Sequence, residues 1–452
     1  MLRISCYTTA IFLTGMLLFS SCQKKLDVTS PQNVSGEEVL SNDENVKKAL
    51  NGAYDAVSNG YLLGGEFQLY SELLAANGEI RWTGTYEQPR EVYTKQILVT
   101  NSYVASTYDD AYYAINICNN ILKAIDVVNE EDRDRVKGEA LFLRGLMYFE
   151  LVELYAKPYS DGNAATNLGL QLITTPTIGN ISDSNYVARS TVQQTYDLVL
   201  NDLTQAQSLL PDDNDVYANR FTAAAVLSRV YLQMLNYEKA RDEANLVITE
   251  GNYSLVKNFA DEFNNSSNTS EDIFAMQVNE QDGSNDMQLF WSIKTYGARD
   301  GDVDVLQKEV NEFEDGDARK ALYYLDATNV YRSGKWKYQY NNLPIIRLAE
   351  MYLTRAECNF RLGTAVGATP YEDIKTIRSR AGLTTDPSYI TLANILLERK
   401  RELEDEGQDI QDRKRLKETV ETYPYDANEL TFPMPQREID ASNGSLQQNE
   451  GY

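Results

Sequence analysis

The 452-residue sequence contains no histidine. This absence excludes Ser–His and Cys–His nucleophile pairs, because these need an imidazole to take the proton from the nucleophile. It also excludes imidazole metal ligands, which are common in zinc sites. Any chemistry of the chain must therefore use carboxylates, amides, hydroxyls and aromatic rings.

Basic residues are scarce relative to acidic ones. The chain has 42 Lys and Arg against 67 Asp and Glu, which gives a formal net charge of −25. Such a surface repels phosphate backbones, so we exclude nucleic acid as a partner. It also repels anionic lipids, so any attachment to a membrane must be covalent. The basic clusters at 399–401 and 413–415 are flanked by acids, and we interpret them as solvent-exposed helix faces.

Cysteine is also rare, with four residues in the whole chain. Cys6 lies near the N-terminus and Cys22 follows an apolar stretch. Cys118 and Cys358 lie within helix-like patterns, where we expect buried free thiols. A disulfide between these two is the alternative, but the sequence cannot supply its geometry.

Long apolar runs are absent after the N-terminus. Residues 1–21 contain one basic residue, a short apolar run and two serines directly before Cys22. The run is too short to span a bilayer as a helix and is typical of an export signal. Because LFSSC resembles the lipobox of bacterial lipoproteins, we expect 1–21 to be a signal peptide and Cys22 to be lipidated. The alternative is an ordinary secretory leader. Residues 22–45 are polar and are predicted to be a tether.

Helical periodicity dominates the rest of the chain, which predicts a mainly α fold. Residues 46–452 are predicted to form one domain. Its helical scaffold is expected at 46–60, 104–250 and 343–406, and the irregular regions 61–103 and 251–340 are expected to face the ligand. The predicted helices are 46–58, 104–128, 132–157, 191–210, 220–235, 237–250, 343–362, 370–381 and 391–406.

Two of these segments form a tetratricopeptide-like helix pair. Ala224, Ser228 and Tyr231 fall on one face of the first helix, and Ala240 and Ala244 fall on the second. Small residues at facing positions let two antiparallel helices approach closely. One such pair cannot bury its faces alone, so we expect several units stacked into one scaffold.

Seven segments, from Cys22 to Tyr452, have a recognisable order along the chain: CQKKLDVTSP, DDAYYAINICNNIL, GEALFLRGLMYFELVELYAKPY, LPIIRLAEMYLTRAEC, IRSRAGL, ERKRELEDEG and QQNEGY. Together they resemble the SusD/RagB family of nutrient-binding outer-membrane lipoproteins. The resemblance implies a tetratricopeptide scaffold with irregular ligand loops. It also implies a lipid-anchored protein on the surface of a Bacteroidetes-type cell, which captures an oligosaccharide or a peptide and lids a SusC-like TonB-dependent transporter.

The charged residues of these segments are interpreted as structural ion pairs rather than catalytic groups. Four acids and bases of ERKRELEDEG fall at helical spacing, and we expect them to pair with Arg378 or Arg380 of IRSRAGL. The four are Glu398, Arg401, Glu402 and Glu406.

Tyrosine is abundant, with 31 copies, and three tryptophans are present. Sugars have apolar ring faces and hydroxyl edges, so a site for them needs flat aromatics beside Asn, Gln, Asp or Arg. Trp82 lies in a Gly-containing segment without helical periodicity, and we predict a loop with the indole as ligand platform. Trp291 and Tyr296 are predicted to supply a second surface; for these tryptophans and Trp336 the alternative is core packing. The predicted ligand-binding residues are Asn77, Arg81, Trp82, Tyr86, Gln88, Trp291, Tyr296 and Arg299.

No cofactor is expected, because the sequence has no Gly-rich phosphate loop and no CxxC pair. The run DGDVD at 300–304 places carboxylates at alternate positions, as calcium loops do, but it lacks the other loop residues and is interpreted as a solvated loop. Three loop tryptophans favour a glycan over a peptide as the ligand. The rival classes are a carboxylate-only glycosidase and a scaffold that binds proteins.

Overall fold

The computed structural model describes residues 40–177, 186–281 and 285–452. The predicted signal peptide, Cys22 and most of the predicted tether lie outside the described residues. Within these ranges no helix is both long enough and apolar enough to cross a membrane.

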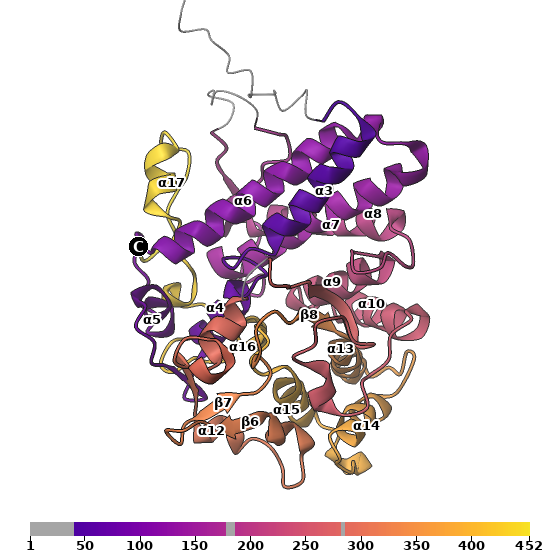
Figure 1. The fold of residues 1–452 in the computed structure, drawn as a ribbon, viewed down its shortest axis with the longest axis vertical. Coiled ribbons are helices and arrows are strands. Elements are labelled where there is room, and N and C mark those ends of the chain that lie inside the picture. Colours follow the sequence, from indigo (N-terminus) through magenta and orange to yellow (C-terminus); the bar gives the residue numbers. More distant parts are fainter. Residues whose placement is uncertain (1–39, 178–185, 282–284) are drawn as a thin grey trace, which may run out of the picture.

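The N-terminal half is a layer of long helices (Figure 1). The helix α7 packs against α3, α6 and α8, and α8 in turn packs on α9. Capping boxes at Thr191 and Asn219 fix the starts of α8 and α9, because each cap side chain satisfies backbone N–H groups of the first turn. The helices are α3 (Asp43–Val57), α6 (Ser102–Lys123), α7 (Glu130–Tyr155), α8 (Val192–Leu209), α9 (Arg220–Gln233) and α10 (Tyr237–Glu250), with the 3₁₀ turn η2 (Ile125–Val127) and the hairpin β2 (Leu168–Gln171)–β3 (Arg189–Thr191) beside them.

The predicted tetratricopeptide-like pair is confirmed by α9 and α10. The Ser228 hydroxyl donates to the carbonyl of Ala240 at 2.9 Å, which requires the close helix approach that the small residues allow. Asn236 caps α10 by accepting from the N–H of Lys239. The second helix of the pair then packs on the C-terminal helix α13 (Leu348–Leu362), so the units stack as expected.

The C-terminal scaffold begins with a strand, and this corrects the predicted helix at 343–362. The strand β8 (Leu343–Arg347) pairs with β4 (Asp272–Met276), and α13 starts only at Leu348. Pro344 lacks the N–H that a helix interior needs, and the β-branched Ile345 and Ile346 favour a strand. The remaining elements are α14 (Pro370–Arg380), η7 (Pro387–Tyr389), α15 (Leu392–Leu403), α16 (Asp409–Leu416), η8 (Asn428–Leu430) and α17 (Gln436–Ala441).

The two regions expected to be irregular contain short regular elements and are joined by a sheet. Its strand order is β1-β5-β7-β6, and antiparallel pairing of β1 with β5 connects the region 61–103 to the region 251–340. The helix α4 is buried on all sides, so it has no polar face and gave no amphipathic signal. These elements are α4 (Glu66–Ala75), β1 (Ile80–Trp82), α5 (Glu87–Tyr93), η4 (Phe259–Glu262), α11 (Asp286–Trp291), η5 (Lys294–Tyr296), β5 (Val303–Val305), α12 (Gln307–Val310), η6 (Ala318–Leu322), β6 (Tyr323–Leu325) and β7 (Tyr331–Ser333).

A buried ion-pair network lies where the second region meets the C-terminal helices. Arg347 pairs with Glu271 at 2.7 Å, and Arg380 pairs with both Glu271 and Glu402. Arg378 pairs with Glu398 at 3.0 Å, so the predicted pairing between the two motifs is confirmed. Three arginines around Glu402 lower the pKa of its carboxyl to about 2.

The basic clusters at 399–401 and 413–415 are mostly buried, which corrects their interpretation as solvent-exposed faces. Arg399, for example, is 1% exposed and bonds Asp412, while Arg415 bonds Glu357. The flanking acids that suggested a solvated surface are instead the partners that allow these charges to be buried. Cys118 and Cys358 are buried free thiols, as predicted, and burial raises the pKa of Cys118 to about 12.

Candidate ligand-binding site

Three tyrosines from separate elements form a continuous aromatic surface, called here the tyrosine ladder. Tyr61 follows α3, Tyr86 precedes α5, and Tyr103 lies in the first turn of α6. The ring of Tyr103 stands edge-on to both others, with centroids 5.4 Å from Tyr61 and 6.1 Å from Tyr86. Tyr86 is 37% exposed, and the other two rings are half-buried. The ladder therefore offers apolar faces and hydroxyl groups to solvent together.

Arg299, from the region 251–340, contacts the ladder. Its guanidinium lies 3.8 Å from the centroid of Tyr86, which is a stacked cation–π geometry. Its Nη2 donates to the Thr85 hydroxyl at 2.9 Å, and its Nε donates to Asp302 at 2.5 Å. These contacts fix the orientation of both Arg299 and Tyr86, so the ladder is preorganised.

Trp82 lies behind the ladder and is not an exposed platform, which corrects the predicted loop. Phe290 contacts Tyr86 on one side and Trp82 on the other, with centroids 6.1 and 5.7 Å apart. The indole is 5% exposed, and Trp291 is 0% exposed. Both belong to the hydrophobic core, as does Trp336, whose Nε1 donates to the carbonyl of Asp405 at 2.7 Å.

The burial of Trp82 follows from strand alternation and from a glycine. In β1 the side chains of Ile80 and Trp82 face the core, while Arg81 faces solvent. A Cβ on Gly84 would lie 2.5 Å from the indole Cζ2, so the backbone of Gly84 covers the ring. The glycine that suggested a loop is therefore needed for the tryptophan to be buried.

The polar residues predicted beside Trp82 are dispersed. Gln88 donates to Ser102 at 3.2 Å, next to Tyr103, so it lies at the edge of the ladder. Arg81 pairs with Asp304 at 2.6 Å on the exposed face of β1. Asn77 accepts from the N–H of Glu421 at 3.1 Å and from Lys308 at 2.7 Å, so its partners belong to other segments.

Tyr296 belongs to a second aromatic group, called here the Lys337 cluster. It consists of Lys337 and the rings of Tyr296, Tyr324 and Tyr338. Because Trp291 is in the core and Tyr296 is half-buried at the surface, these two do not form the joint surface that the sequence suggested. Only two residues lie between Tyr296 and Arg299, so the same loop contributes to both aromatic groups.

Two carboxyls lie beside the ladder. Glu66 is 1% exposed and accepts a hydrogen bond from Tyr70, and burial raises the pKa of its carboxyl well above the usual range. Asp286 is half-buried, and burial raises its pKa to about 6. Burial is the main cause that raises the pKa of Tyr61 and of Tyr103, and the charges of both acids raise it further. At neutral pH the ionised Asp286 is an acceptor suited to a sugar hydroxyl.

The run 300–304 forms ion pairs and part of a strand, which corrects the interpretation as a solvated loop. Asp300 pairs with Lys294 at 2.6 Å, and Asp302 pairs with Arg299. Asp304 is buried in β5, where it pairs with Arg332 at 2.9 Å. Across the described ranges, no group of three or more acids, cysteines or histidines is placed to hold a metal ion.

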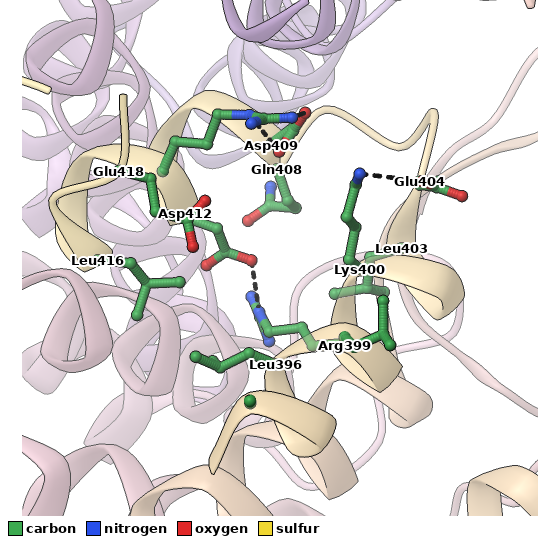
Figure 2. Close-up of a pocket in the computed structure, with 13 residues that line it drawn as sticks. Leu396, Arg399, Lys400, Leu403, Glu404, Gln408, Asp409, Asp412, Leu416 and Glu418 are labelled. Atoms are coloured by element: carbon green, nitrogen blue, oxygen red, sulfur yellow. Dashed lines mark hydrogen bonds and ion pairs between the residues drawn. The ribbon is translucent and has the colours of Figure 1, made fainter. Parts of the chain in front are cut away.

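A cavity of about 380 Å³ lies between α15 and α16 (Figure 2). Its charged side chains already pair with one another, as Arg399 does with Asp412 at 2.7 Å and Arg413 does with Asp409 at 3.0 Å. Leu396, in contrast, is one of several leucines that line the apolar side. None of the residues predicted to bind ligand lines this cavity, so we place the candidate site at the ladder.

Sequence reasoning missed Tyr61 and Tyr103. Tyr61 lies in the Gly-rich turn NGYLLGGE, and Tyr103 lies one residue before the predicted start of a helix. The available signal was the high tyrosine content, because half-exposed rings near loop ends suit ligand contact. The three tryptophans are a less reliable signal than the tyrosines, because large indoles are more often core residues.

Comparison with known families covers most of the chain. The family described as "Starch-binding associating with outer membrane" matches residues 24–232, and the one described as "SusD family" matches residues 249–432. The SusD-like protein P25 of Formosa agariphila is 23% identical over 83% of this chain and 82% of its own length.

Solved structures share the fold. A SusD superfamily protein of Bacteroides thetaiotaomicron superposes with a TM-score of 0.80 at 26% identity, covering 90% of this chain and 99% of its own. A SusD superfamily protein of Bacteroides vulgatus gives 0.81 at 23% identity, over 91% and 99% of the two chains. Surface glycan-binding protein A of B. thetaiotaomicron gives 0.75 at 19% identity, over 91% and 100%.

Proposed function

This chain belongs to the SusD family, and we propose on that premise that it captures oligosaccharides on the tyrosine ladder without hydrolysing them. The observation that supports this best is the stacked arrangement of Arg299 on the exposed ring of Tyr86 at 3.8 Å. An exposed ring with an ordered guanidinium stacked on one face combines an apolar surface with hydrogen-bond donors, which is what a sugar ring requires.

The ladder also has acceptors for sugar hydroxyls. Asp286 lies near Tyr61, and the phenol groups of the ladder both donate and accept. A peptide is the second candidate ligand. A site for a peptide would need exposed backbone groups or a groove. The ladder favours the glycan because its surface consists of ring faces and side-chain polar groups.

The proposed function is capture rather than catalysis. A glycosidase needs two carboxyls that flank the bond, one of them acting as acid and the other as base or nucleophile. At the ladder, Glu66 is buried and accepts a hydrogen bond from Tyr70, so it is a poor partner for Asp286 in such a pair. The SusD-family scaffold supports the same choice.

Delivery is the last step of the proposal. We expect lipidation at Cys22 to hold the protein at the outer cell surface, and the captured oligosaccharide to pass to a SusC-like TonB-dependent transporter. The acidic composition supports a covalent anchor, because a net charge of −25 opposes electrostatic attraction to anionic lipid.

The test starts from a glycan array probed with the purified protein, followed by calorimetry on the best oligosaccharide. Tyr86→Ala should weaken binding about thirtyfold, the typical effect of losing an aromatic anchor worth about 2 kcal/mol. The control is Tyr113→Ala on α6, a ring that is 64% exposed and outside the ladder. Equal losses for both variants, full affinity in Tyr86→Ala, or no glycan bound by the wild-type chain would overturn the proposal.

A further inference from the structure

The Lys337 cluster holds an ammonium group among aromatic rings. The Nζ of Lys337 lies 4.5 Å from the ring centroid of Tyr296, 4.9 Å from that of Tyr324 and 5.5 Å from that of Tyr338. The ring of Tyr296 stands edge-on to the other two, with its centroid 5.3 Å from that of Tyr338 and 6.1 Å from that of Tyr324. Tyr338 is 47% exposed, so the cluster opens to solvent on that side.

The backbone around Lys337 is held in place from three directions. The N–H groups of Lys337 and Tyr338 both donate to the side chain of Asn264, at 2.7 and 3.1 Å. Ser292 donates to the carbonyl of Lys337 at 2.8 Å, and Gln339 donates to the carbonyl of Gly297 at 2.7 Å. The cluster is therefore a built feature of the surface rather than a mobile lysine that meets tyrosines by chance.

The ammonium has no carboxylate partner among the described residues. In the loop that contributes Tyr296, by contrast, Lys294 pairs with Asp300 at 2.6 Å and Arg299 pairs with Asp302. Ring faces attract a cation, but they accept its N–H groups only weakly, and an ammonium has three donors to satisfy. In a chain with 67 acids, a half-buried lysine that pairs with no carboxylate among the described residues is a positive position open to a ligand.

We propose that Lys337 selects glycans that bear carboxylate or sulfate groups, an inference that rests on the proposed function. A charged sugar would stack on the exposed ring of Tyr338 while its anionic group accepts from the ammonium. The loop that contains Tyr296 also contains Arg299, so one extended acidic oligosaccharide can contact both this cluster and the tyrosine ladder. The negative charge of the whole protein opposes this at long range, but salt screens exposed charges beyond about 8 Å.

The experiment compares matched oligosaccharides on the intact protein. Hexagalacturonate supplies carboxylates, a carrageenan hexasaccharide supplies sulfates, and the methyl ester of hexagalacturonate supplies the same backbone without charge. Calorimetry is done with wild type, Lys337→Met, Lys337→Arg and the control Lys294→Met, whose ammonium already has an acidic partner. The methionine variant keeps an apolar stem against the rings, and thermal melts confirm that each variant is folded.

We expect wild type to bind at least one acidic oligosaccharide more tightly than the ester. Lys337→Met should weaken that binding about tenfold or more, the loss typical of one charge-assisted hydrogen bond, while the ester is unaffected. Lys337→Arg should keep most of the affinity, and Lys294→Met all of it. Wild type that binds the ester or neutral array glycans as tightly, or acidic binding unchanged in Lys337→Met, would overturn the inference and leave glycan capture standing. Absence of binding to any glycan would overturn both.

Discussion

Replacing Trp82 with alanine should destabilise the fold and leave ligand affinity nearly unchanged. The indole is 5% exposed, packs on Phe290 and is covered by Gly84. A tryptophan buries about 200 Å², which corresponds to about 5 kcal/mol at about 25 cal/mol per Å². The indole Nε1 has no hydrogen-bond partner, so its removal also relieves an unsatisfied buried donor. We therefore expect a net loss of about 3 kcal/mol, at the low end of the usual range for such truncations.

The predicted loss translates into a measurable change in melting temperature. With an unfolding entropy of about 2.1 cal/mol/K per residue, a loss of about 3 kcal/mol lowers the midpoint of a chain of this length by about 3–4 °C. Scanning calorimetry should show this shift in Trp82→Ala. Trp82→Phe, which keeps most of the packing, should shift the midpoint by about 1 °C.

Titration calorimetry of the same variants separates packing from binding. Below its melting temperature, Trp82→Ala should bind the selected oligosaccharide within about threefold of wild type, because the exposed ring at the ladder is Tyr86. Tyr86→Ala should show the opposite pattern, with a small thermal shift and a large loss of affinity. An unchanged melting temperature together with a tenfold loss of affinity in Trp82→Ala would refute the reasoning and show that the indole meets the ligand.

The remaining predictions concern charge, the anchor and the partner. Glu402→Gln should lower the free energy of unfolding by about 3–5 kcal/mol in chemical denaturation, because arginines would be left partly unpaired. The stability of the wild type should fall as the pH drops from about 4.5 toward 2, where the lowered pKa of Glu402 lies. The raised pKa of Asp286 gives stability that is present below about 4 and lost as the pH rises through about 6, so Asp286→Asn should flatten that part of the pH–stability curve. Cys22→Ala should abolish lipid labelling and membrane fractionation; unchanged fractionation would exclude lipidation at this residue. Gentle detergent extraction should co-purify a β-barrel transporter in stoichiometric amount, and isolation of this protein alone would count against that partner.

The scaffold was predictable because amphipathic helices leave a strong periodic signal. α9 and α10 lie where spacing and small residues placed them, and Ser228 makes the close contact that the pattern required. Two elements gave no such signal. The helix α4 is buried on every side, and β8 continues without a turn into α13, so one apolar run contained two kinds of structure.

The sequence predicted the region of the candidate site but only some of its residues. Tyr86, Arg299 and Gln88 lie at or beside the ladder, whereas Trp82 and Trp291 are in the core. The ladder and the Arg299 that stacks on it come from segments that are up to 238 residues apart in sequence, from Tyr61 to Arg299. No local pattern describes such a contact, because it depends on the pairing of β1 with β5.

The contrast between buried ion pairs and an exposed aromatic ring explains why the motifs indicate the family but not the ligand. Arg347, Arg380 and Glu402 come from three separate motifs and meet in one buried network with Glu271. A buried charge that loses its partner destabilises strongly, so these residues are coupled to one another across the chain, and a sequence with all of them specifies the scaffold. The exposed ring of Tyr86 has no such coupling, since its replacement would leave no buried charge unpaired. Ligand preference can therefore change while the motifs stay, and for this chain it must be determined from the ladder and the Lys337 cluster themselves.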